Sequence, residues 1–160
     1  MSYDGGNDYE ALVSRFAPWG VALLAALMIG LVAFAPVKAD PDKRKAYGCF
    51  TAANASPIRL DAQGMRILQP EPIQIGFHLE LHKTGIELTA EAPIEASPQG
   101  AGYRYAIKPP GIGRFLSFTV ERDGRTYGVF DEDALVQFVM LADDGHYILY
   151  RKSAASMCPN

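Results

Sequence analysis

Hydrophobic and polar residues divide the chain into one long uncharged run and a longer region of short alternating segments. The run covers residues 16–37 and lies between Arg15 and Lys38. At about 1.5 Å per residue, a helix of this length is roughly 33 Å long, enough to cross the hydrocarbon core of a bilayer. Because a helix satisfies its own backbone hydrogen bonds within lipid, the run predicts a single transmembrane helix.

A cleaved signal peptide is the alternative for this run, since Val37, Lys38 and Ala39 place small residues where a signal peptidase reads. Such a peptide has a short basic start and an apolar stretch of about 7–15 residues. Residues 1–15 instead contain Asp and Glu and only one Arg, and the apolar run is longer. We therefore expect an uncleaved anchor.

One face of the predicted helix carries small residues at four-residue steps, namely Ala22, Ala26 and Gly30. Small residues let a second transmembrane helix approach closely, and van der Waals packing then drives association in lipid. The alternative is that these residues simply face lipid. We expect the three positions to form a helix-packing face.

Residues 74–82 show the clearest alternation after the run. Ile75, Phe77, Leu79 and Leu81 point to one side of an extended chain and the polar residues to the other. Residues 83–85 form a turn, and residues 86–90 continue the apolar face on a return strand. This pattern predicts a β-hairpin.

Three further hairpins and two isolated strands are predicted along the rest of the chain. The hairpins pair residues 58–60 with 65–68, 114–121 with 125–130 and 135–141 with 146–152, and residues 47–51 form a first strand. A second isolated strand is predicted over residues 103–107. Residues 92–102 are predicted as a loop, and residues 131–140 fit either a strand or a short capped helix.

The predicted fold is therefore a membrane-anchored all-β protein, in which the helix precedes an antiparallel β-meander. A barrel or sandwich of about eight strands closes such a meander and removes exposed edges. The predicted organisation is a polar tail over residues 1–15, the helix over 16–37, a charged linker over 38–46 and the β domain over 47–160.

The net charge and the position of the basic residues indicate which kinds of partner the protein contacts. The net charge is −3, and the one basic cluster, Lys43, Arg44 and Lys45, lies next to the predicted helix. This position predicts contact with lipid headgroups and gives no indication of a nucleic-acid partner.

Two cysteines, Cys49 and Cys158, stand at the two ends of the predicted β domain. Because the ends of a domain often lie close together, we expect a disulfide between them, which forms in an oxidising compartment. The alternative is two unrelated thiols.

The distribution of basic residues conflicts with this compartment. Arg15 precedes the predicted helix, whereas Lys38 and the basic cluster at residues 43–45 follow it, and basic residues favour the cytoplasmic side. We give the cysteines more weight, because their placement at both domain ends needs a reason. The sequence therefore predicts a protein of the cell (inner) membrane with its domain on the periplasmic, extracytoplasmic side.

The sequence His78-Leu79-Glu80-Leu81-His82 holds the most suggestive chemistry. On a strand, His78, Glu80 and His82 share one face, where they could ligate a zinc-type ion or act as an acid–base pair. Alternate positions on a strand lie almost 7 Å apart, so convergence on one ion needs a curved sheet. The alternative is the solvated face of an amphipathic hairpin.

No nucleophile elbow, Walker loop or H-E-x-x-H motif occurs, and no cofactor other than this possible metal ion is indicated. Aromatic residues are plentiful, and most of them are expected to line the core. The alternative is that Tyr103 and Tyr105 share an outer face of a strand and form an exposed protein-contact patch.

These observations favour a non-catalytic accessory, scaffold or assembly subunit of a larger membrane complex. It would contact the lipid bilayer and other membrane subunits through its helix and its β domain. One alternative is a membrane-tethered metal-binding protein or metal-dependent enzyme centred on His78, Glu80 and His82. Another is a β-barrel that binds a small apolar ligand in a large pocket.

Overall fold

The computed structural model describes residues 21, 24, 26, 27, 39–111 and 113–158. The chain divides into two compact units, Met1–Ala39 and Asp40–Asn160. The predicted transmembrane segment lies outside the described residues except for four helical positions, Val21, Leu24, Ala26 and Leu27. Ala22 and Gly30 of the predicted packing face also lie outside them. Within the part of the chain that is described, no helix reaches the length and apolar character needed to cross a membrane.

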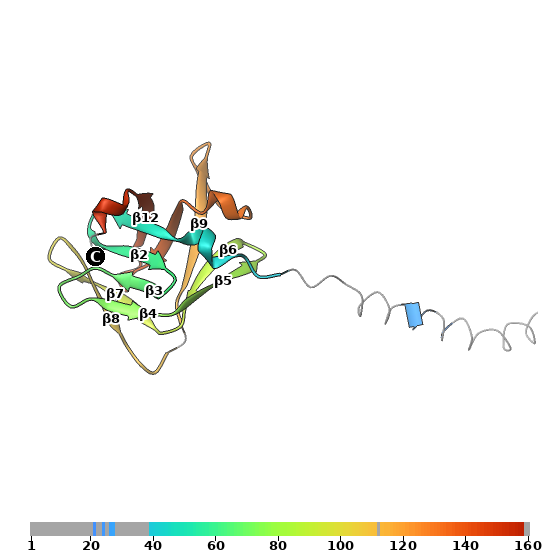
Figure 1. The fold of residues 1–160 in the computed structure, drawn as a ribbon, viewed down its shortest axis with the longest axis horizontal. Helices are drawn as coiled ribbons and strands as arrows, with labels where there is room; N and C mark the ends of the chain where they lie inside the picture. The colour runs from blue at the N-terminus through green and yellow to red at the C-terminus, as the bar shows by residue number, and fades with distance from the viewer. Residues whose placement is uncertain (1–20, 22–23, 25, 28–38, 112, 159–160) are drawn as a thin grey trace, which may run out of the picture. The chain divides into compact units, whose positions relative to one another are not determined.

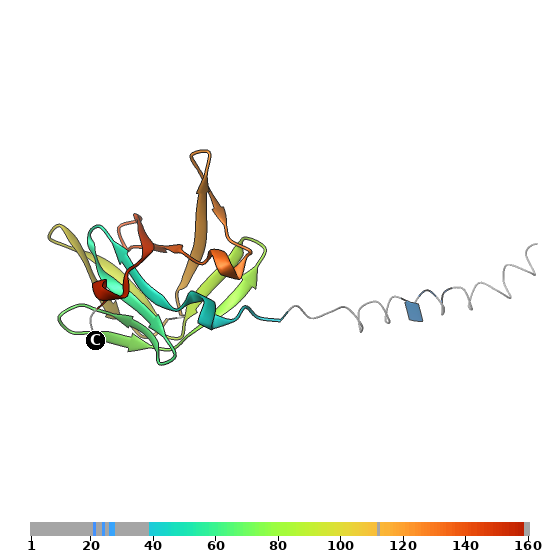
Figure 2. The same ribbon diagram turned by 45° about the horizontal axis from the view of Figure 1, so that its top comes forward.

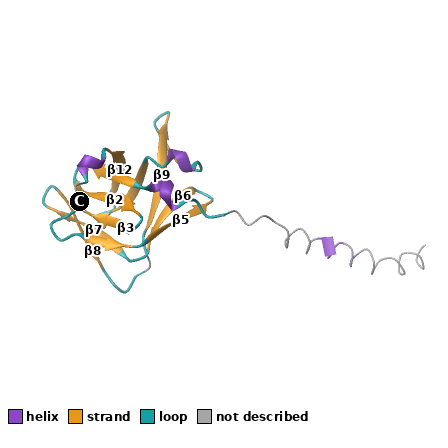
Figure 3. Cartoon of the chain, in the orientation of Figure 1, coloured by secondary structure: helices purple, strands orange, loops and turns teal. Residues whose placement is uncertain are grey.

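The second unit is built from strands and three short 3-10 helices in its described residues (Figure 3). The strands are β1 (Gly48–Ala52), β2 (Ala55–Asp61), β3 (Gly64–Ile67), β4 (Ile73–Ile75), β5 (Phe77–His82), β6 (Gly85–Ala90), β7 (Ile94–Gln99), β8 (Gly102–Ile107), β9 (Phe115–Arg122), β10 (Arg125–Gly128), β11 (Gln137–Leu141) and β12 (Tyr147–Ser153). The helices are η1 (Lys43–Ala46), η2 (Glu132–Ala134) and η3 (Ala155–Met157).

The main sheet runs in the order β4-β3-β2-β1-β12-β11-β9-β6-β5 (Figure 1). Its two end strands, β4 and β5, follow one another in the chain with only Gly76 between them. The carbonyl of Gly76 accepts a hydrogen bond from the amide of Glu91 at 2.9 Å, just after β6. The ends of the sheet therefore meet in one bent segment, so the sheet is a nearly closed barrel. The prediction of an antiparallel all-β barrel or sandwich is confirmed, but the described residues form twelve strands where about eight were predicted.

Two hairpins extend this barrel. Among the described residues, strand β10 pairs only with β9, and Figure 2 shows the β9–β10 ribbon projecting away from the other strands. Strands β7 and β8 pair with each other, and Ala55 of β2 pairs with Tyr103 of β8 in the one parallel bridge. Ile94, Ala96 and Tyr105 are buried in the core, so one face of the β7–β8 hairpin covers the barrel interior.

The structure differs from the predicted elements in residues 92–102 and decides between two predicted alternatives for residues 131–140. The loop predicted over residues 92–102 is wrong, because β7 occupies Ile94–Gln99. Its alternation is weak, since Ala96 contributes little apolar surface and Pro98 is atypical of strands. Residues 131–140 are both a turn and a strand: Asp131 caps η2 by accepting from the amide of Asp133 at 3.0 Å, and β11 follows.

Aromatic side chains fill the barrel. The ring of Phe138 lies 5.0 Å from that of Phe50, 5.7 Å from that of Phe118 and 5.1 Å from that of Tyr150, measured between centroids. All four residues are fully buried. This interior is therefore occupied by the protein's own side chains, which leaves the small-ligand hypothesis without support.

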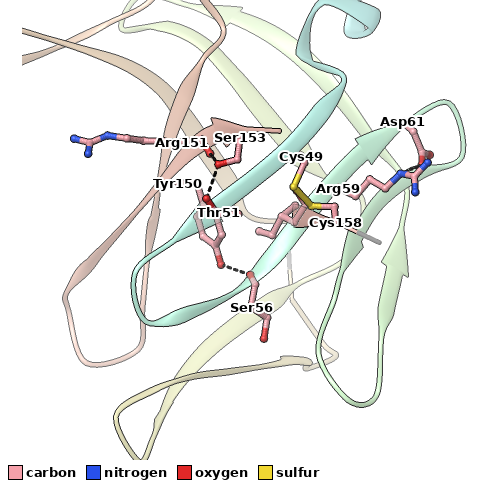
Figure 4. Close-up of a disulfide and its surroundings, with 10 residues drawn as sticks. Cys49, Thr51, Ser56, Arg59, Asp61, Tyr150, Arg151, Ser153 and Cys158 are labelled. Atoms are coloured by element: carbon pink, nitrogen blue, oxygen red, sulfur yellow. Dashed lines mark hydrogen bonds and ion pairs between the residues drawn. A yellow bond between two sulfur atoms is a disulfide. The ribbon is translucent and has the colours of Figure 1, made fainter. Parts of the chain in front are cut away.

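A buried hydrogen-bonded chain runs through two tyrosines (Figure 4 shows its outer end). The hydroxyl of Tyr150 donates to the carbonyl of Ser56 at 3.0 Å, so the hydroxyl of Tyr105 donates to Tyr150. Burial raises the pKa of Tyr105 to about 12 and raises the pKa of Tyr150 well above its ordinary value. Both side chains therefore remain neutral in the folded domain at pH values at which the same side chains of an unfolded chain would ionise.

Above about pH 10 we expect the free energy of unfolding to fall as pH rises, because the unfolded chain loses tyrosine protons that the folded domain keeps. Each group contributes up to about 1.4 kcal/mol per pH unit, and the loss for Tyr105 continues to its folded pKa of about 12. Urea unfolding across this range checks the slope. Tyr105→Phe should show a shallower slope than the wild type, and equal slopes would contradict the assignment.

The predicted disulfide between Cys49 and Cys158 is confirmed (Figure 4). Their Cα atoms lie 5.7 Å apart across a sequence separation of 109, and both residues are buried. Cys49 belongs to β1, and Cys158 directly follows η3, which packs beside β1. The bridge therefore fastens the C-terminal end of the domain to its first strand.

Candidate functional site

The outward-facing residues of five neighbouring strands form one continuous surface. The five strands are neighbours in the order β12, β11, β9, β6 and β5. In each neighbouring pair, the register places an outward-facing residue of one strand directly opposite an outward-facing residue of the other. The central row of this outer face is Leu149, Val139, Ser117, Glu87 and Glu80. The predicted polar face of the β5–β6 hairpin is thus one end of a wider surface that reaches β12.

The structure brings His78, Glu80 and His82 together at this end. His78 Nε2 lies 2.6 Å from one carboxylate oxygen of Glu80, and His82 Nε2 lies 2.8 Å from the other. The hydrogen bonds from His78 and then His82 lower the pKa of Glu80 below its ordinary value. The long side chains therefore bridge the spacing of alternate strand positions without a sharply curved strand.

Glu87 completes this group, which we call the His–Glu cluster (His78, Glu80, His82 and Glu87). Glu80 and Glu87 are direct cross-strand partners, and like charges placed in this way destabilise a sheet. Glu87 accepts hydrogen bonds from the hydroxyls of Thr84 at 3.1 Å and Ser117 at 3.3 Å. Together with the two imidazoles on Glu80, these donors offset the repulsion.

A metal ion would need the imidazole nitrogens to point at one common position. Instead, the Nε2 atoms of His78 and His82 each point at a different oxygen of Glu80. Throughout the described residues, no group of three or more histidine, cysteine or acidic residues is arranged to hold a metal ion. The geometry therefore gives the metal-site hypothesis no support.

Three apolar side chains stand exposed on the same outer face, and we call them the apolar row: Phe115, Leu141 and Tyr147. They are 49%, 43% and 72% exposed. Leu141 and Tyr147 are cross-strand partners. Val139 pairs with Ser117, and Leu141 and Phe115 lie two residues away from this pair on their own strands, on the same side of it. The row therefore crosses three neighbouring strands, β9, β11 and β12.

The apolar row adjoins the His–Glu cluster. The ring of Phe115 stands edge-on to that of His82, with their centroids 6.1 Å apart. Thr89 pairs with Phe115 on one side and with His78 on the other. Its hydroxyl is buried and has no hydrogen-bond partner among the described residues. A buried hydroxyl without a hydrogen-bond partner is energetically costly.

Tyr105 lies in the core, where most aromatic residues were expected, and only 1% of it is exposed. The alternative of an exposed patch at Tyr103 and Tyr105 is therefore wrong. The signal for the apolar row was present in β9, where Phe115 is out of phase with the buried residues Leu116 and Phe118. Recognising the row also requires the pairing of β9 with β11, which the sequence pattern alone does not specify.

Comparison with known proteins does not assign this surface a role. No protein-family model, no curated protein and no solved structure matches the chain.

Proposed function

We propose that this chain is a non-catalytic, single-pass membrane protein that acts as an accessory, scaffold or assembly subunit of a larger membrane complex. The observation that carries this proposal is the apolar row. Neighbouring strands are about 4.8 Å apart, so its three side chains form one contiguous apolar surface on a rigid sheet. Aromatic residues are typical of the cores of protein interfaces.

The proposed partner is another protein subunit of the same membrane. Its contact surface would be apolar opposite Phe115, Leu141 and Tyr147. The His–Glu cluster beside Phe115 would then form part of the polar rim that surrounds an interface core.

The disulfide supports an oxidising location for the domain, since such bridges are rare where thiols are kept reduced. We therefore propose that residues 16–37 anchor the chain in the cell (inner) membrane with the β domain on the periplasmic side. Ala22, Ala26 and Gly30 would pack against a helix of the partner.

Site-specific photo-crosslinking in the native membrane tests the docking surface. A benzophenone amino acid at Tyr147 should give an adduct of one defined mass with a membrane protein, whereas one at Ala62 in the β2–β3 turn should not. Both positions are exposed, so access of the probe is matched. Leu141→Asp should lower the yield at Tyr147 by at least about fivefold, because it places a charge in the interface core.

Three results would contradict the proposal. Equal yields at Tyr147 and Ala62 would show that the row is no preferred contact, as would a yield that Leu141→Asp leaves unchanged. An adduct with the mass of two copies of this chain would identify self-association in place of a different subunit. Urea unfolding of Leu141→Asp shows whether the variant stays folded.

A further inference from the structure

The length of chain before the β domain restricts what can lie beside the membrane. The predicted membrane-spanning run ends at residue 37, and the second compact unit begins at Asp40. Three Cα–Cα steps of at most about 3.6 Å keep Asp40 within roughly 11 Å of the end of the run. The headgroup layer on each side of a bilayer is about 5–8 Å deep. A run that spans the bilayer therefore holds the surroundings of Asp40 at the membrane surface.

Contacts between η1 and η2 define the surface of the domain at this point. The backbone amide of Asp42 donates to the carboxylate of Glu132 at 3.3 Å, and Lys45 Nζ lies 2.6 Å from a carboxylate oxygen of Asp133. Ala46 is fully buried in the core. Part of the predicted charged linker is thus folded onto the domain, and η1 and η2 lie together where the chain enters it.

Two exposed apolar residues, Phe130 and Val136, flank η2 in the sequence. They are 60% and 51% exposed. Their backbone is held on the barrel: the carbonyl of Val129 accepts from the amide of Ile86 at 2.6 Å, and the carbonyl of Val136 accepts from the amide of Lys152 at 2.7 Å. Phe130 therefore projects from a fixed support.

The basic residues on this surface are largely paired within the domain, and acidic residues outnumber them. Arg44 lies 2.7 Å from a carboxylate oxygen of Asp42, and its hydrogen bonds lower the pKa of that carboxyl group. Lys45 is paired with Asp133. Two of the three basic residues expected to contact headgroups thus have carboxylate partners already. This arrangement favours apolar insertion over attraction to anionic lipids.

We propose that the surface formed by η1, η2, Phe130 and Val136 rests on the bilayer, with the ring of Phe130 at the boundary between headgroups and hydrocarbon. Exposed aromatic and aliphatic side chains are what peripheral proteins insert at that depth. The inference rests on the proposed anchor in residues 16–37 and adds a defined membrane-facing side to the β domain. Its ligand is a zwitterionic phospholipid surface.

Fluorescence quenching by lipid tests this contact on the full chain in phosphatidylcholine nanodiscs. Trp19 is the single tryptophan, so Trp19→Phe provides a dark background for one added probe. Lipids brominated near the headgroup should quench Phe130→Trp at least about twofold more than Tyr147→Trp, a matched control at another exposed aromatic position.

The outcomes separate this inference from the proposed anchor. Flotation of the chain with lipid vesicles after an alkaline carbonate wash, which releases peripheral contacts, reports the anchor by itself, and failure to float overturns the anchor and this inference together. A chain that floats but shows equal quenching at positions 130 and 147 keeps its anchor and overturns the bilayer contact. Urea unfolding of both tryptophan variants confirms that each is folded, so unequal quenching reports position alone.

Discussion

Replacing Cys49 and Cys158 by alanine is expected to lower the free energy of unfolding of the β domain by about 2–5 kcal/mol. The bridge joins residues with a sequence separation of 109. A closed loop of about 100 residues removes enough entropy from the unfolded chain to stabilise a fold by up to about 4.7 kcal/mol. Urea unfolding of the oxidised protein and of the double variant measures the difference.

The double variant also supplies its own control. The chain contains two cysteines, so the variant in which both are alanine has no disulfide that a reducing agent could reduce. Reduction should therefore destabilise the wild type to about the level of the double variant and leave the variant unchanged. A loss below about 1 kcal/mol in the double variant would contradict a stabilising role for the bridge.

Phe138→Ala is expected to destabilise the domain by about 3–5 kcal/mol. The ring of Phe138 lies within 5.7 Å of three other aromatic rings, and the residue is fully buried. Its removal loses the transfer free energy of the side chain and leaves a cavity that the surrounding strands cannot close. The change in urea midpoint at constant slope reports this loss.

Two matched substitutions show whether burial is the cause. Phe138→Leu retains much of the volume and should be clearly less destabilising than the alanine variant. Phe130→Ala removes the same side chain from an exposed position and should change stability by no more than about 0.5 kcal/mol in detergent. Similar losses for Phe130→Ala and Phe138→Ala would contradict the assignment of Phe138 to the core.

The hairpins could be predicted from the sequence because each depends on local signals. Alternation places Ile75, Phe77 and Leu79 on the buried side of the sheet, and the Asp123-Gly124 pair marks the β9–β10 turn. The bridge between Cys49 and Cys158 followed from their position at the domain ends. These features need no knowledge of which strands become neighbours.

Features that depend on long-range pairing could not be predicted in the same way. Tyr105 is buried because its hydroxyl meets Tyr150, which lies 45 residues further along the chain. The apolar row exists only because β11 lies between β9 and β12. Three members of the His–Glu cluster, His78, Glu80 and His82, were predicted as a set, but the hydrogen bonds within the cluster depend on side-chain conformations that strand spacing does not determine.

The two proposed contact surfaces lie at different positions along the same strands. Phe130 directly follows Val129, whose carbonyl binds Ile86, whereas Phe115 pairs with Thr89, three residues further along β6. At about 3.3 Å per residue, the apolar row therefore begins roughly 10 Å beyond the level of Ile86. A domain seated on the bilayer through Phe130 would present the row to the part of a partner that stands clear of the membrane.

The bridge between Cys49 and Cys158 also determines how the domain responds to mechanical force. The chain enters the domain at η1, a few residues before Cys49, and Cys158 follows the last strand and η3. Tension applied between the residues before Cys49 and those after Cys158 would pass through the sulfur–sulfur bond and bypass the barrel strands after Cys49. Such a pull would thus cross the domain without extending the fold between the two cysteines.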